Sequence, residues 1–86
     1  LGARLAKLAQ SAQVIVVTHL AQVASWADAQ FVVSKGGDPS ADGVSTTVRE
    51  VREEERVAEI ARMLSGSESE TSLDHARELL AESRLD

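Results

Sequence analysis

The chain has 86 residues, enough for one small domain. It contains no cysteine, one Trp and one Phe, which excludes a disulfide scaffold, a thiolate zinc site and an aromatic platform for single-stranded nucleic acid. Residues 1–35 carry three basic side chains against one acidic, whereas residues 36–86 carry six basic against thirteen acidic. The acidic second half is therefore not expected to bind a phosphate backbone.

The first third of the chain predicts a helix followed by a strand. Leu1, Leu5 and Leu8 recur at helical spacing, and the pattern continues to Ala12. The next run, Val14–Val17, is β-branched without alternation, which is typical of a strand buried on both faces of a parallel sheet. It is far too short to span a bilayer. Because the chain starts with Leu inside a helical pattern, we expect it to be part of a longer protein that supplies the missing sheet partners.

A second helix and a hairpin are expected next. Thr18 can cap a helix whose apolar positions lie between residues 20 and 27. Residues 31–33 form a short apolar strand, and the Gly-, Asp- and Pro-rich residues 36–43 predict a loop. Residues 44–51, rich in Val and Thr, predict a strand paired back on the previous one.

Two helices are expected to complete the chain. Three glutamates from Glu53 suit the positive end of a helix dipole, and Gly66 ends that helix. The final helix carries Leu73, Ala76, Leu79 and Leu80 on one face. Its start fits either of two capping boxes, Ser67 with Glu70 or Thr71 with Asp74.

The residue that could carry chemistry is His19, at the carboxyl end of the predicted buried strand. In open α/β sheets, ligands bind in the crevice beyond the carboxyl ends of the strands. An imidazole there could meet the terminal phosphate of a nucleotide, and phosphoryl transfer depends mainly on positioned donors. Alternatively, His19 merely helps to begin a helix. A metal site built on His19 and His75 is not expected, because no third ligand lies near either in the sequence.

Residues 14–27 resemble the switch-histidine loop of ABC-type ATPases, in which a strand ends in Thr-His or Ser-His. Three segments within residues 18–28, 54–66 and 75–80 are similar to the RecN family of bacterial DNA-repair ATPases: THLAQVA at 18–24 followed by Ala27-Asp28, EERVAEIARMLSG at 54–66 and HARELL at 75–80. The resemblance covers nearly the whole chain, and the last two segments have no counterpart in transporters. Ala21 is a departure, since the family often has Pro at that position.

The resemblance implies an SMC-like protein with a long coiled coil and heads that pair around ATP, acting in recombinational repair of double-strand breaks. It implies that His19, with Thr18, lies on the γ-phosphate side of ATP. Neither the glycine-rich phosphate loop nor the Asp-Glu pair that would hold Mg²⁺ is present in the sequence. We therefore expect ATP and Mg²⁺ to bind only the complete protein, and the chain alone to be inactive in hydrolysis.

The fold class expected is α/β: the C-terminal fragment of an ABC/SMC-type P-loop ATPase head, with one buried strand, a short antiparallel pair and two C-terminal helices. Residues 1–86 would form part of one head, with residues 1–52 as its α/β part and residues 53–86 as a helical tail. The expected partners are the remainder of the head, a second head in a homodimer and DNA bound through the parent protein, in the bacterial cytoplasm at the nucleoid and without membrane contact. The alternatives are a small non-catalytic α/β interaction module and the end of an ABC transporter ATPase subunit.

Overall fold

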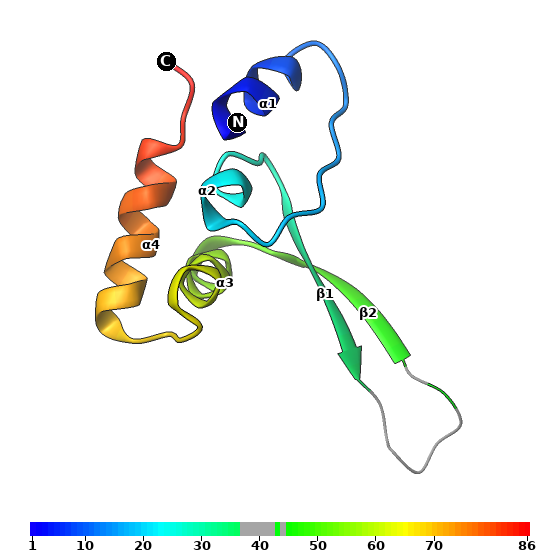
Figure 1. Cartoon of the computed structure of the whole chain (residues 1–86), viewed down its shortest axis with the longest axis vertical. Coiled ribbons are helices and arrows are strands. Elements are labelled where there is room, and N and C mark those ends of the chain that lie inside the picture. Colours follow the sequence, from blue (N-terminus) through cyan, green and yellow to red (C-terminus); the bar gives the residue numbers. More distant parts are fainter. Residues whose placement is uncertain (37–42, 44) are drawn as a thin grey trace.

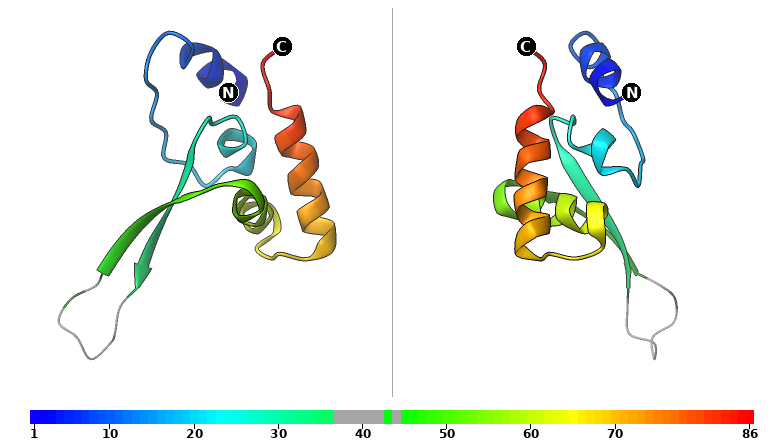
Figure 2. Two further views of the ribbon diagram at one scale, coloured as in Figure 1. Left: turned by 180° about the vertical axis from the view of Figure 1, so that it is seen from behind. Right: turned by 60° about the vertical axis from the view of Figure 1, so that its left-hand side comes forward.

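A computed structural model describes residues 1–36, 43 and 45–86. Four helices and one hairpin follow each other along the chain (Figure 1). The elements are α1 (Gly2–Leu8), α2 (Ala21–Ala24), β1 (Gln30–Gly36), β2 (Ser45–Val51), α3 (Glu53–Ser65) and α4 (Glu70–Glu82). The helices gather at one end of the molecule, and both termini lie there as well (Figures 1 and 2).

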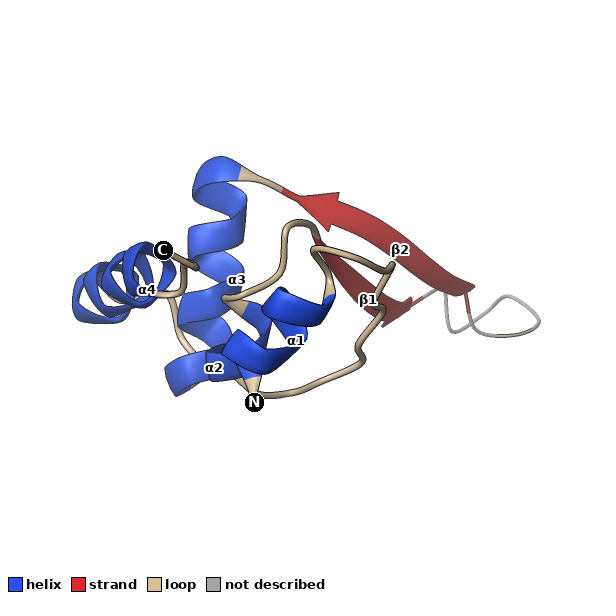
Figure 3. Ribbon diagram, turned by 90° about the horizontal axis from the view of Figure 1, so that it is seen from above, coloured by secondary structure: helices blue, strands red, loops and turns tan. Residues whose placement is uncertain are grey.

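The hairpin projects from the helical body to one side (Figure 3). Its strands pair antiparallel in the register Gln30↔Val51 to Gly36↔Ser45, which confirms the predicted pairing. The first strand is longer than the predicted residues 31–33. Near the helices Gln30 and Val51 are buried, whereas Phe31, Val33 and Val48 are exposed farther out. The predicted loop at 36–43 and the start of the second strand at Val44 fall largely on residues 37–42 and 44, outside the described part.

The core lies where α3 and α4 pack against each other and against α2. Ile60, Ala61 and Ala76 are fully buried there, and Ala21 of α2 is nearly so. The helical spacing of these apolar positions explains why one face of each helix is covered. Gly66, in the left-handed conformation at φ 77°, ends α3 as predicted.

The expected buried strand at Val14–Val17 is not formed in this chain. The segment has no regular secondary structure, and Ile15 and Val17 are 83% and 99% exposed. A strand requires a neighbour for its backbone N–H and C=O groups, and the sheet of the described residues contains β1 and β2 alone. The apolar pattern therefore identifies a segment suited to a sheet but does not supply the partner.

Three helix boundaries also differ from the sequence predictions. Helix α1 ends at Leu8 rather than near Ala12, and Leu1 and Leu8 of its apolar face are exposed. The N-cap of α2 is Leu20, not Thr18. The cap of α4 is Ser69, which accepts a hydrogen bond from the Ser72 N–H, so neither predicted capping box forms. Several Ser and Thr side chains offer similar caps there, and tertiary contacts of Ser72 select one.

Candidate functional site

His19 lies in a tight turn between the segment Val14–Val17 and α2. The Thr18 hydroxyl oxygen accepts the N–H of Leu20 at 3.0 Å, so that Thr18 closes the turn instead of capping the helix. The His19 side chain is exposed and makes no hydrogen bond to the described residues. Because the Thr18 hydroxyl accepts in this bond, its own hydrogen is still available to a ligand. The turn thus offers two side-chain donors, from neighbouring residues, to anything bound beside it.

The turn continues into α2 through backbone hydrogen bonds. The Leu20 carbonyl accepts from the N–H groups of Val23 at 3.1 Å and Ala24 at 3.0 Å. Leu20 has an extended backbone, so its own N–H points back to Thr18 rather than into the helix. The position of His19 consequently depends on how α2 is held.

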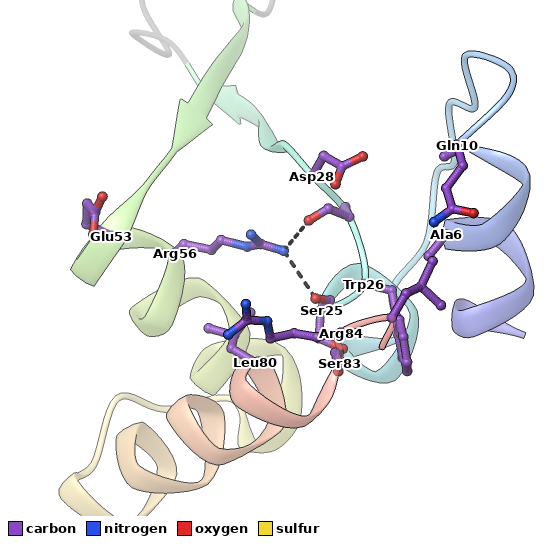
Figure 4. A pocket seen from close by; sticks show the side chains of 13 residues that line it. Ala6, Gln10, Ser25, Trp26, Asp28, Glu53, Arg56, Leu80, Ser83 and Arg84 are labelled. Atoms are coloured by element: carbon purple, nitrogen blue, oxygen red, sulfur yellow. Dashed lines mark hydrogen bonds between the residues drawn. The ribbon is translucent and has the colours of Figure 1, made fainter.

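Arg56 of α3 binds the carboxyl-terminal end of α2. Its Nη2 donates to the backbone carbonyls of Ala24 at 3.2 Å, Ser25 at 3.3 Å and Ala27 at 2.8 Å. Its Nε donates to the Gln30 Oε1 at 3.1 Å. The three backbone carbonyls lie at the end of α2 and in the turn that follows it, where helical hydrogen bonding stops, and an arginine side chain is a common way to satisfy such groups. Figure 4 shows the Arg56 side chain reaching from α3 to this end of α2.

The charge of Arg56 is matched by dipoles rather than by a bonded carboxylate. No salt bridge of Arg56 occurs within the described residues, and Asp28 acts on it only through space. Burial lowers the pKa of Arg56 from its ordinary value, and the Asp28 carboxylate opposes this change. A guanidinium still remains charged, because its pKa starts so high. Four hydrogen bonds therefore fix one half-buried cation against α2.

Ser83, at the end of α4, holds α2 at the same end. Ser25 and Ser83 are buried, with their hydroxyl oxygens 2.7 Å apart, and the Ser83 hydroxyl donates to the Leu79 carbonyl at 2.7 Å. The Ser25 hydroxyl also lies 3.5 Å from the Gln22 carbonyl, but each hydroxyl has one hydrogen, and the much shorter Ser83–Leu79 contact favours Ser25 as the donor to Ser83. The two hydroxyls form a short polarised chain from α2 into α4.

An open cavity of about 700 Å³ lies beside these contacts. It is bounded by parts of α1, the turn after α2, α3 and the end of α4, and its lining includes Trp26, Asp28, Arg56 and Arg84 (Figure 4). His19 does not line it, and neither does His75, which is exposed on α4. Thr18 and His19 are neighbours in the turn before α2, whereas His75 is an exposed residue of α4.

Sequence reasoning did not identify Arg56, Ser25 or Ser83. One signal was present for Arg56: it lies four residues before Ile60 and seven before Met63, on the apolar face of α3. A cation at such a position needs buried acceptors. Nothing in the sequence indicates that these acceptors are the carbonyls of a helix about thirty residues earlier.

No protein-family model matches the chain. It is 53% identical, over its whole length, to the DNA repair protein RecN of Streptomyces coelicolor, and 49% identical, again over its whole length, to that of Mycobacterium tuberculosis. It is 51% identical to RecN of Deinococcus radiodurans over 91% of the chain. The chain belongs to the RecN family. It spans 15% of the length of the Streptomyces protein and 14% of the other two, and it matches their C-terminal portion.

The identification confirms the resemblance seen in residues 18–28, 54–66 and 75–80. The His19 turn and the helices that hold α2 therefore correspond to one short C-terminal stretch of the much longer RecN relatives. Within the described residues, no group of three or more His, Cys, Asp or Glu side chains is arranged to hold a metal ion. None of the described helices is both long enough and apolar enough to cross a membrane.

Proposed function

We propose that this chain is the C-terminal part of an ATPase head in a protein of DNA double-strand-break repair and recombination. Residues 1–52 supply its α/β part and residues 53–86 its helical tail. In this proposal, His19 donates a hydrogen bond on the γ-phosphate side of bound ATP, and Thr18 assists. The observation that carries it is the exposed His19, with no hydrogen bond to the described residues, in a turn closed by Thr18. The DNA-repair name of relatives about 50% identical supports the biological role.

The residues present fit a supporting role toward ATP. The chemistry is transfer of the terminal phosphoryl group to water, in which charge moves among the phosphate oxygens. An imidazole N–H and the Thr18 hydroxyl can both stabilise such charge when they are held in position. The backbone cradle for the other phosphates and the carboxylates for Mg²⁺ would come from other parts of the protein. His19 is thus expected to affect the rate more than the affinity.

The segment Val14–Val17 is proposed to complete a sheet formed by the remainder of the same head. It is in no helix, and its Ile15 and Val17 side chains are 83% and 99% exposed. Unpaired backbone groups flanked by β-branched side chains favour the addition of a neighbouring strand. That pairing would place His19 at the carboxyl end of a buried strand. A second head and DNA are the further partners in this proposal.

The test uses a RecN chimaera, in which residues 1–86 replace the matching C-terminal portion of the Streptomyces coelicolor protein. ATP affinity and steady-state ATP turnover are measured for the unchanged RecN chimaera and for its His19→Ala variant. Selective loss of turnover supports the proposal. A chimaera that is folded yet neither binds nor hydrolyses ATP would overturn the proposed function.

A further inference from the structure

We propose that Arg56, together with Ser25 and Ser83, is a positioning device that holds α2 and thereby sets the place of His19. We call these three residues the α2 clamp. The inference rests on the proposed function of His19 and extends it: the helical tail serves the histidine turn as its support. None of the three clamp residues is expected to touch ATP.

Helix α2 needs such a support because of its size. It has four residues, and its N-cap Leu20 makes no side-chain capping bond. A single helical turn is unstable alone, since it fixes several backbone dihedrals for very few hydrogen bonds. The stability of α2 must therefore come from contacts with the rest of the chain.

The α2 clamp provides these contacts from two helices at once. Arg56 of α3 binds three carbonyls at the end of α2 and its turn, and Ser83 at the end of α4 accepts from Ser25. The planar guanidinium restricts direction as well as distance. Helices α3 and α4 share the buried core of Ile60, Ala61 and Ala76. The clamp therefore fastens a weak element to the best-packed part of the chain.

A continuous hydrogen-bonded path leads from Arg56 to the histidine turn. Arg56 donates to the Ala24 carbonyl, and the Ala24 N–H donates to the Leu20 carbonyl at 3.0 Å. The Leu20 N–H then donates to the Thr18 hydroxyl at 3.0 Å. His19 lies between the last two partners, so a shift at one end of α2 is transmitted to its imidazole.

The test compares four variants of the RecN chimaera. Arg56→Met removes all four hydrogen bonds while keeping an unbranched apolar stem, and Arg56→Lys keeps the charge and some of the donors. Arg62→Met is the matched control, since Arg62 lies on the same helix but is exposed and paired with Glu59. A fourth variant, Ser83→Ala, removes the hydrogen bond between the Ser25 and Ser83 hydroxyls. Hydrogen exchange of peptides covering residues 18–26 and 57–82 is measured alongside ATP affinity and turnover.

We expect Arg56→Met to speed exchange in residues 18–26 by about tenfold or more and to leave residues 57–82 protected. Turnover should fall by at least about tenfold, since a displacement of about 1 Å can cost on the order of 10²-fold, with ATP affinity nearly unchanged. Arg56→Lys should recover part of both losses, Ser83→Ala should show a smaller loss, and Arg62→Met should match the unchanged chimaera.

Two results would overturn the inference while leaving the proposed function intact. The first is that Arg56→Met hydrolyses ATP as fast as the unchanged RecN chimaera while His19→Ala hydrolyses it more slowly. The second is that Arg56→Met speeds hydrogen exchange throughout α3 and α4, which would make Arg56 a general stabiliser of the fold. Parental turnover in His19→Ala would instead overturn the proposed function, and the positioning role with it.

Discussion

Gly2 and Trp26 are packed so closely that no side chain fits between them. A Cβ atom at Gly2 would lie 2.3 Å from Cδ1 of the Trp26 ring and 2.9 Å from the backbone oxygen of Gln22. Both neighbours belong to α2 or the turn that follows it, so this contact is the point where α1 rests on the α2 region. Gly2 is buried as a result, although it is the first residue of α1.

Gly2→Ala is therefore expected to destabilise the docking of α1. Alanine is the better helix former by up to about 1 kcal/mol, but overpacking a close contact typically costs about 1–3 kcal/mol. The cost of the steric clash should exceed the gain in helix propensity, because one of the obstructing atoms belongs to the backbone and cannot move aside easily. Trp26 is the one Trp of the chain, so a red shift of its fluorescence would report the loss of cover. Gly36→Ala is the control, since nothing lies within 4 Å of a Cβ there; equal spectra for both variants would contradict the prediction.

The exposed segment Val14–Val17 predicts self-association of the isolated chain. A β-branched run with exposed apolar side chains at Ile15 and Val17 can pair as a strand with the same segment of another copy. Substituting lysine at both Ile15 and Val17 should shift the chain toward monomer, because like charges would meet across any such pairing. Sedimentation velocity over a range of concentrations measures this change.

Leu8→Lys serves as the comparison in that experiment, because Leu8 is exposed on a different element, α1. A chain that is monomeric without any substitution would contradict the prediction. If Leu8→Lys alone abolished self-association, the surface through which the copies associate would lie on α1 instead.

The sequence predicted the elements that depend on neighbours close in the chain. The hairpin followed from β-branched strands around a turn-rich stretch, and α3 from its apolar spacing and Gly66. The strand at Val14–Val17 did not form, because its pattern describes burial between partners that the described residues do not provide. Arg56 was missed for a related reason: its partners are backbone carbonyls, which leave no mark on the sequence.

The N-cap of α4 was also not identified from the sequence, and its observed hydrogen bonds lead to a prediction about stability. Ser69 accepts the Ser72 N–H at 3.2 Å, and its hydroxyl donates to the Ser72 hydroxyl at 2.9 Å. Losing an N-cap of this kind costs about 0.5–2 kcal/mol, so Ser69→Ala should lower the free energy of unfolding by that amount. Ser67→Ala and Thr71→Ala should each cost less. Denaturant unfolding of the RecN chimaera and hydrogen exchange at α4 compare the stability losses of the three variants. A larger loss for Ser67→Ala or Thr71→Ala than for Ser69→Ala would show that one of the predicted capping boxes forms after all.

The pair of histidines provides the most direct test of the proposed chemistry. His19 and His75 are both exposed, but His19 lies in the turn before α2 while His75 lies in the middle of α4. Losing one preorganised donor to developing charge typically costs about 10²–10³ in kcat, so His19→Ala in the RecN chimaera should reduce turnover on that order. ATP affinity should change little, because most of it comes from donors outside this chain. His75→Ala should leave turnover near the value of the unchanged chimaera.

Each variant is first checked for folding by circular dichroism and then assayed for ATP affinity and steady-state hydrolysis. Equal turnover in the two variants would show that His19 is simply a residue that begins a helix, and loss of affinity without loss of rate would make it a binding residue rather than one that acts as charge moves.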